Sequence, residues 1–382
     1  MRIRSAARPC MAVILILLLV LVIVQHRRPS RTRAFSGSNA GLSEEEMDLL
    51  DSIKFEDLEN ILPSSVKHKT AILVVIEVET RPAFYGHALT SVACYARAQN
   101  YEFRILFPTN FSKECRHKDV YLRRHCVVAH ILPQYHTILY IDADMGVVNP
   151  KKRIEEYMDN DAEIIFFDRF YNWEVAAGSY IVRNTQWTQK FLKDLADYER
   201  RLPRQYHGTD NGALHALLGE VLFGEDRKSE LNFCLRIYYN LLIPEDLFTF
   251  EACIRQMLGM NNKWGKIKIL KKGTAWVRDN WMTNTKWSPE RDFMMHNWKI
   301  TQLRKYMGSD LPLMLHGPSK GEWFLPFLGM FRLDLCTPGN LTWNYDPNLI
   351  ETTAKIERKL QYLYDRIERD RIKSLARMIE YL

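Results

Sequence analysis

Beyond residue 33 the sequence lacks net charge. The formal charge of the 382 residues is +7, and the first 33 residues carry all of it, because they contain seven arginines and no Lys, Asp or Glu. A protein that binds nucleic acid needs its excess positive charge on the folded part of the chain. The sequence therefore excludes nucleic acid as a partner.

Cysteine is scarce, with seven residues in the chain. Cys10 lies in an apolar run near the N-terminus, and the other six form an even set, as expected of a protein in a compartment that permits disulfides. Six cysteines allow fifteen pairings, and the sequence does not choose among them. Buried free thiols are the alternative. The six residues are Cys94, Cys115, Cys126, Cys234, Cys253 and Cys336.

No apolar run reaches the ~20 residues that cross an average bilayer as a helix. The run Cys10–Val24 has fifteen residues without a polar side chain, and arginines flank it on both sides. These charged flanks argue against a buried core helix. A cleaved signal peptide would need a small-x-small cleavage site after the apolar run, and the sequence has none there. We therefore predict an uncleaved signal-anchor at residues 10–24, whose short span would suit a thinner early-secretory membrane.

Two sequons bear on the orientation of this anchor. Asn110-Phe111-Ser112 and Asn340-Leu341-Thr342 make Asn110 and Asn340 candidate N-glycosylation sites, which are modified only on the lumenal side. Together with the cysteines they predict a single-pass type II protein of the Golgi (or ER) membrane. The expected parts are a cytosolic tail at 1–9, the transmembrane anchor at 10–24, a polar stem at 25–65, one lumenal domain at 66–345 and an amphipathic C-terminal helix at 346–382.

From Thr70 onward, short apolar runs alternate with helical stretches. Alternating strands and helices are typical of right-handed βαβ units. We therefore predict an α/β, Rossmann-like fold, with a mostly parallel sheet flanked by helices and ligands bound beyond the carboxyl ends of the strands. Strands are expected at 71–76, 101–107, 137–141 and 163–167, and helices at 86–100, at 119–132 and from Pro150.

Two aspartates follow the third predicted strand, at Asp142 and Asp144. Their carboxylates repel each other unless a cation sits between them. Mn²⁺ or Mg²⁺ fits, because these ions take oxygen ligands and bridge substrate phosphates. Haloacid-dehalogenase-type phosphatases carry a similar Asp-x-Asp string, but after their first strand and followed by Thr or Val at the position of Gly146. The sequence therefore favours a metal site that holds a phosphorylated ligand.

A third metal ligand is expected from a later segment. His296 is the preferred candidate and His316 the second, because each follows an apolar run and has a lysine three or four positions on. Lys299, the lysine after His296, would meet a phosphate oxygen. A packed core histidine is the alternative for either residue.

Two blocks lie between these motifs. Gly178-Ser179 would let a backbone approach a ligand closely, although an ordinary loop between strands also explains it. Thr209-Asp210 begins a helical pattern and has the form of an N-cap, which is its structural alternative.

Four stretches, taken together, resemble the nematode-expanded family of nucleotide-diphospho-sugar transferases. More distantly they are similar to the retaining family of yeast α-1,2-galactosyltransferase, mannan-polymerase subunits and plant xyloglucan xylosyltransferases. Their order and spacing extend the resemblance over about residues 70–300. The stretches are Asp142–Asp144, residues 177–187, Asp210-Asn211 and residues 292–296.

The resemblance implies a GT-A-like fold, a Mn²⁺-dependent UDP-sugar donor and transfer with retention of anomeric configuration. On the matching positions, Asp142 and Asp144 would hold the metal and the ribose-diphosphate, with His296 as the third ligand. Asp210 would lie near the acceptor or the reacting sugar.

We therefore predict a metal-dependent glycosyltransferase that moves a hexose, galactose by the resemblance, from a nucleotide sugar to a glycan acceptor. Asp210 and Asp168 are the candidate catalytic residues, which would position hydroxyls or stabilise oxocarbenium-like charge. The alternative is a non-catalytic lumenal glycan-binding or scaffolding protein with the same fold, and the sequence leaves a homo-oligomer open. The candidate donor contacts are Asp142, Arg124, Lys299, Gly178 and Ser179.

Overall fold

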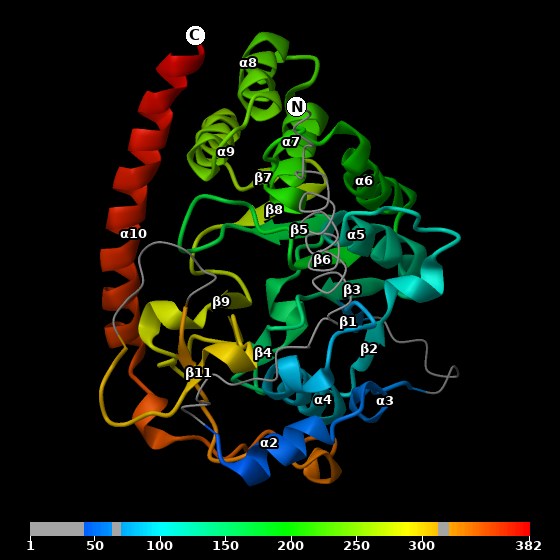
Figure 1. Ribbon diagram of the computed structural model, residues 1–382, viewed down its shortest axis with the longest axis vertical. Coiled ribbons are helices and arrows are strands. Elements are labelled where there is room, and N and C mark those ends of the chain that lie inside the picture. Colours follow the sequence, from blue (N-terminus) through cyan, green and yellow to red (C-terminus); the bar gives the residue numbers. More distant parts are fainter. Residues whose placement is uncertain (1–41, 63–69, 312–320) are drawn as a thin grey trace, which may run out of the picture. The chain divides into compact units, whose positions relative to one another are not determined.

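A computed structural model describes residues 42–62, 70–311 and 321–382 (Figure 1). Its main element is a seven-stranded sheet with the order β2-β1-β3-β6-β5-β8-β7. Five strands share one direction, whereas β6 and β7 run opposite to them. The predicted α/β fold with a mostly parallel sheet is confirmed. The strands are β1 (Thr70–Val75), β2 (Glu102–Leu106), β3 (Thr137–Tyr140), β5 (Ile164–Phe167), β6 (Tyr180–Arg183), β7 (Lys263–Trp264) and β8 (Ile267–Leu270).

Both faces of this sheet are covered. Successive side chains of a strand point to opposite faces, and on β1 Ala71 and Leu73 belong to one apolar core while Ile72 and Val74 belong to the other. A strand buried on both faces has apolar residues at every position. This explains why residues 71–76 form a continuous apolar run and do not alternate with polar residues.

Helices cover one face, and a helix with a small sheet covers the other. The first core includes side chains from α5 (Val120–Ile131), α6 (Gln186–Asp197), α7 (Thr209–Phe223), α8 (Lys228–Tyr239) and α9 (Pro244–Leu258). The second core includes α4 (Gly86–Gln99) and a three-stranded sheet with the order β4-β10-β9. Its strands are β4 (Gly146–Val147), β9 (Val277–Asp279) and β10 (Met294–His296).

A C-terminal helix occupies the central part of the segment 346–382, for which the sequence predicts an amphipathic helix. This helix, α10 (Thr353–Ala376), lies beside α9 (Figure 1) and buries Ile356, Leu360 and Leu363 in a third apolar cluster. A short two-stranded sheet, β11 (Leu303–Arg304) and β12 (Trp323–Phe324), precedes it in the chain.

The described part of the predicted stem packs on the domain. Ser43 caps α2 (Glu44–Asp51) and forms a capping box with Glu46. Leu50, on α2, and Leu58, on α3 (Phe55–Leu58), have no exposed surface. Residues 42–62 therefore add to the folded body, which the polar composition of the segment did not indicate.

The helix predicted to begin at Pro150 does not form. The backbone N–H groups of Val148 and Asn149 both donate to the carbonyl of Phe293, at 2.9 and 3.2 Å, which holds this stretch against the segment leading into β10. The next helical residues are the 3₁₀ turn Ile154–Tyr157. Long-range pairing therefore prevails over the local preference of proline for a helix start.

The predicted Golgi or ER membrane location is contradicted. Within residues 42–62, 70–311 and 321–382, no helix combines the length and the apolar character that crossing a membrane requires. The anchor predicted at residues 10–24, on which the location depended, lies outside the described residues.

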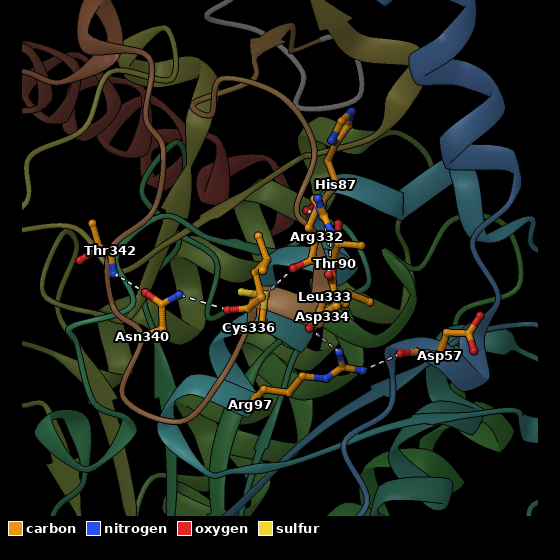
Figure 2. Close-up of a disulfide and its surroundings, with 12 residues drawn as sticks. Asp57, His87, Thr90, Arg97, Arg332, Leu333, Asp334, Cys336, Asn340 and Thr342 are labelled. Carbon is orange, nitrogen blue, oxygen red and sulfur yellow. Dashed lines mark hydrogen bonds and ion pairs between the residues drawn. A yellow bond between two sulfur atoms is a disulfide. The ribbon is translucent and has the colours of Figure 1, made fainter.

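All six cysteines of the even set form disulfides, so the alternative of free thiols is wrong. The pairs are Cys94–Cys336, Cys115–Cys126 and Cys234–Cys253. The first joins α4 to a segment 242 residues later. Figure 2 shows Arg97 beside it, donating to the carbonyls of Asp57 at 2.7 Å and Leu333 at 2.9 Å. This disulfide therefore lies where the N-terminal segment, α4 and the C-terminal segment meet.

Both sequons are exposed. Asn110 lies in a 3₁₀ turn, Pro108–Phe111, after β2. The side-chain amide of Asn340 donates to the carbonyl of Leu335 at 3.1 Å, and its oxygen accepts from the backbone of Thr342 at 3.3 Å (Figure 2). Their glycosylation stays a prediction.

We expect the Cys94–Cys336 disulfide to stabilise the fold more than Cys115–Cys126 does. The two bonds close loops with sequence separations of 242 and 11 residues, and the chain-entropy model gives about 5 and about 3 kcal/mol for such loops. Replacing each pair by serines and measuring the free energy of unfolding in urea tests this order. Equal losses would contradict it.

Candidate metal centre

The pairing of β3 with β6 brings Gly178 to Asp142. These strands are antiparallel, with Tyr140 opposite Tyr180, so the residues just after β3 lie beside those just before β6. A Cβ atom added at Gly178 would overlap the Asp142 carboxylate. Glycine at this position is therefore what leaves room for the carboxylate.

The small sheet brings His296 to Asp144. Met295 on β10 lies opposite Gly146 on β4, two residues after Asp144. The backbone N–H of Trp298 then donates to the carbonyl of Asp144 at 2.9 Å. Backbone contacts on both sides of His296 therefore hold its segment beside the loop that contains Asp142 and Asp144.

Asp142, Asp144 and His296 form a cluster suited to a divalent ion. One ligand atom from each lies within 4.8 Å of the others. Two carboxylates and one imidazole are side chains that could hold a divalent metal ion. His296 is the histidine brought to this place, whereas His316 lies outside the described residues.

The cluster opens into a cavity of about 550 Å³. The cavity lies where β1 and β3 end, as expected for a ligand site in a sheet of this kind. Its lining includes residues that the sequence placed in the site, namely Arg124, Asp142, Asp144, Gly178, Asp210, His296 and Lys299.

Arg124 joins two of these aspartates. It donates through Nη1 to Asp142 at 2.5 Å and through Nε and Nη2 to Asp210 at 3.1 and 2.5 Å. His125 Nε2 lies 3.1 Å from the same Asp210 oxygen. Burial opposes the charge on Asp210, but Arg124 and His125 outweigh it and hold its pKa well below the usual range. Asp210 is therefore an ionised group and no proton donor.

His296 and Lys299 contact Asp144. His296 Nε2 lies 3.2 Å from Oδ1, and Lys299 Nζ lies 2.9 Å from Oδ2. Burial opposes the charge on Asp144, yet these two cations hold its pKa well below the usual range. For Asp142, burial outweighs Arg124 and raises the pKa. Burial would also keep His296 neutral, but Asp144 and Asp279 outweigh it and raise its pKa to about 9.

Two further site residues did not emerge from the sequence. Asp279 is the last residue of β9, lines the cavity, and accepts a hydrogen bond from His296 Nδ1 at 3.1 Å. Arg169, after β5, also lines the cavity and lies 3.4 Å from Asp279. The short strand Val277–Asp279 ends in an acid, and Asp142 comes two residues after the end of β3; an acid at or just after a strand end was the available signal in the sequence.

Two predicted site residues face elsewhere. Asp168 is buried and pairs with Arg255 of α9 at 2.8 Å, outside the cavity lining. Ser179 is fully buried, where its hydroxyl donates to the carbonyl of Tyr140 at 2.7 Å and accepts from Trp276 at 2.9 Å. The geometry gives Ser179 a structural position behind Gly178, and the catalytic role of Asp168 stays a prediction.

Glu251, on α9, is a buried acid near Arg169 and Glu174. It has no exposed surface, and neither carboxyl oxygen has a hydrogen-bond partner within the described parts of the chain. Burial, together with the nearby Glu174, raises its pKa well above the usual range. Burial therefore favours the neutral form of Glu251.

The fold and the site define an α/β protein with an acidic cleft at the strand ends, where two carboxylates and an imidazole could bind a metal ion. Residues 92–312 match the family described as a protein of unknown function, DUF273, and the chain belongs to that family. No curated protein matches the chain.

Solved structures with some likeness include two glycosyltransferases. One is involved in glycosylation of the major capsid of PBCV-1, with 12% identity, coverage of 59% of this chain and 92% of that chain, and a TM-score of 0.34. The other is the apo form of GlyE from Streptococcus pneumoniae TIGR4, with 12% identity, coverage of 52% and 65%, and a TM-score of 0.28. TM-scores below 0.5 do not establish a shared fold.

We expect Gly178→Ala to weaken metal binding. The added methyl group would displace the Asp142 carboxylate, so the Kd for Mn²⁺ should rise about tenfold or more, as it does when the surroundings of a metal ligand are altered. Isothermal titration calorimetry measures it. Gly265→Ala is the control, because this glycine has a positive φ of 53° and open space around it. That variant should lose about 1 kcal/mol of stability and bind Mn²⁺ normally.

Glu251→Gln should remove a pH dependence of stability. The folded protein keeps the Glu251 proton that the unfolded chain releases above about pH 4.3, so wild-type stability falls as pH rises from there towards the raised folded pKa. The slope of one such group is about 1.4 kcal/mol per pH unit. Thermal unfolding at pH 5 and pH 8 should show a smaller difference for the variant. Identical differences in the two proteins would contradict the assignment of a neutral Glu251.

Proposed function

We propose that this protein is a metal-dependent glycosyltransferase that transfers a hexose from a nucleotide-sugar donor to a glycan acceptor. The observation that carries the proposal is the cluster of Asp142, Asp144 and His296 at the edge of a cavity beyond the strand ends. Paired carboxylates with an imidazole suit an ion that also binds phosphate oxygens. A nucleotide sugar supplies such oxygens in its diphosphate.

Two cations beside the cluster are suited to the same diphosphate. Arg124 and Lys299 line the cavity and already contact the two aspartates. A divalent ion bound there would act as a Lewis acid on the leaving diphosphate. Arg124 and Lys299 would bind its oxygens, where negative charge develops in the transition state. Asp210 orients Arg124 and would place a negative charge opposite the reacting sugar.

The finer assignments come from the sequence resemblance. It favours UDP-galactose as the donor and retention of configuration, with Mn²⁺ as the preferred ion. Asp210 is the better placed of the two predicted catalytic residues, since it lines the cavity and is ionised. In this proposal Asp168 contributes indirectly: its carboxylate pairs with Arg255, and this ion pair holds the loop after β5 in place.

One observation favours a non-catalytic glycan-binding or scaffolding protein instead. Arg124 pairs with Asp142, and His296 and Lys299 pair with Asp144, so each aspartate has a cationic partner in the absence of a metal ion. Retention of both aspartates is therefore compatible with a protein that binds neither metal nor nucleotide.

A thermal-shift titration of the full chain with Mn²⁺ and UDP separates the two functions. A ligand at 100 times its Kd stabilises the folded state by about 2.7 kcal/mol. A transferase should be stabilised by the two ligands together more than by either one. A scaffold should respond to neither, and that result would overturn the proposal. Hydrolysis of a panel of UDP- and GDP-sugars then identifies the donor.

Asp144→Asn should abolish transfer while the fold stays intact. The amide removes one negative ligand from an ion that prefers carboxylate oxygens, so sugar-nucleotide hydrolysis should fall about 100-fold or more. Asp161→Asn makes the same chemical change at a side chain that is 83% exposed and paired with Lys263, and it should keep full activity. Undiminished hydrolysis by the Asp144 variant with added Mn²⁺ would refute the metal assignment.

A further inference from the structure

Asp279 and His296 are paired by strand register. The strands β9 and β10 are parallel, and their aligned pairs end with Asp279 opposite His296. The contact between the two side chains therefore does not depend on a flexible loop. On its other side, β10 pairs with β4, which follows directly from the loop of Asp144. One three-stranded sheet thus sets the order Asp144, His296, Asp279.

The imidazole of His296 lies between the two carboxylates. Nδ1 is 3.1 Å from Asp279 Oδ1, and Nε2 is 3.2 Å from Asp144 Oδ1. The side chain of Asp279 is 2% exposed, and that of His296 is 14% exposed. A histidine that binds a metal through one ring nitrogen usually donates a hydrogen bond from the other, which fixes its tautomer and orientation. The contact with Asp279 has this form.

Arg169 holds Asp279 from behind. Its Nη2 lies 3.4 Å from Asp279 Oδ1, and its Nη1 lies 3.6 Å from Glu174 Oε2. The guanidinium therefore places a positive charge behind the buried carboxylate of Asp279 and favours its ionised form. An ionised carboxylate is the stronger acceptor for the imidazole N–H.

We infer that Asp279 is a positioning residue for the metal centre, and this inference rests on the proposed function. Asp279 accepts a hydrogen bond from Nδ1 of His296. It would thereby direct Nε2, once that nitrogen has lost its proton, at an ion held by Asp142 and Asp144. In this proposal Asp279 is not itself a ligand of the ion, since the cluster of possible ligands consists of Asp142, Asp144 and His296. Arg169 belongs to the same arrangement, since it holds the carboxylate that orients the histidine.

The test is the affinity for Mn²⁺ alone, measured by calorimetry on the full chain. Asp279→Ala should raise the Kd by 10- to 100-fold, the usual range for loss of a partner behind a metal ligand. Asp279→Asn keeps an acceptor oxygen without the charge, so its Kd should lie between those of the wild type and the alanine variant. If the alanine variant fails to fold, the Kd of the asparagine variant for Mn²⁺ still tests the inference.

A double-mutant cycle distinguishes positioning from a general structural role. If Asp279 acts through His296, then Asp279→Ala should change the Kd less than about twofold in a chain that already carries His296→Ala. Glu174→Gln is the matched control, because it removes the other acid beside Arg169 without touching His296. Its affinity for Mn²⁺ should equal that of the wild type.

Each remaining outcome would overturn the inference. Wild-type affinity in a folded Asp279→Ala chain would refute the positioning role and leave the proposed function standing. An undiminished loss in the His296→Ala background would show that Asp279 acts through the fold as a whole. A wild-type chain that binds no Mn²⁺ in the presence or absence of UDP would refute the metal centre, and the role of Asp279 with it.

Discussion

Four aspartates share one cavity, and the need to neutralise them organises the surrounding structure. Buried carboxylates without partners are too costly to keep ionised. The protein meets this constraint with two similar units, in each of which a cation lies between two acids. Arg124 lies between Asp142 and Asp210, and His296 lies between Asp144 and Asp279. The two units differ in one respect, since imidazole is a metal ligand and guanidinium is not.

The residues of these two units are positioned by two separate β-sheets. The large sheet places Asp142 at the end of β3, beside Gly178 at the start of β6. The small sheet adds the loop of Asp144, the histidine strand and the strand of Asp279 through backbone pairing. Neither sheet alone holds a complete set of ligands. The cavity therefore depends on the docking of the small sheet beside the ends of the large one, which the second apolar core provides.

The sequence predicted what local patterns determine. Residues 71–76 and 137–141 are apolar runs long enough to identify strands, and an acid pair directly after a strand identifies the edge where ligands bind. The Ser43 capping box similarly marks the start of α2. These features need only neighbouring residues, so the fold class and the Asp142–Asp144 corner could be predicted.

What the sequence missed depends on contacts between distant residues. The strand Val277–Asp279 has three residues and no clear periodicity, so the role of Asp279 follows only from its pairing with β10. The choice among the disulfide pairings likewise depends on tertiary structure. For Asp168 the sequence showed a polar residue after a strand, but the side chain turns to Arg255 on a helix that sequence patterns alone do not place.

The disulfide between Cys94 and Cys336 has a consequence for biosynthesis. Its two cysteines are 242 residues apart in the sequence. The native partner of Cys94 is therefore missing until nearly the whole chain has been synthesised. During that time the short-range pair Cys115–Cys126 can already close, which removes two competing thiols from exchange. A chain that ends before residue 336 would keep Cys94 on α4 as a thiol without its native partner. The Cys94–Cys336 disulfide can therefore form only after the chain has been synthesised to residue 336.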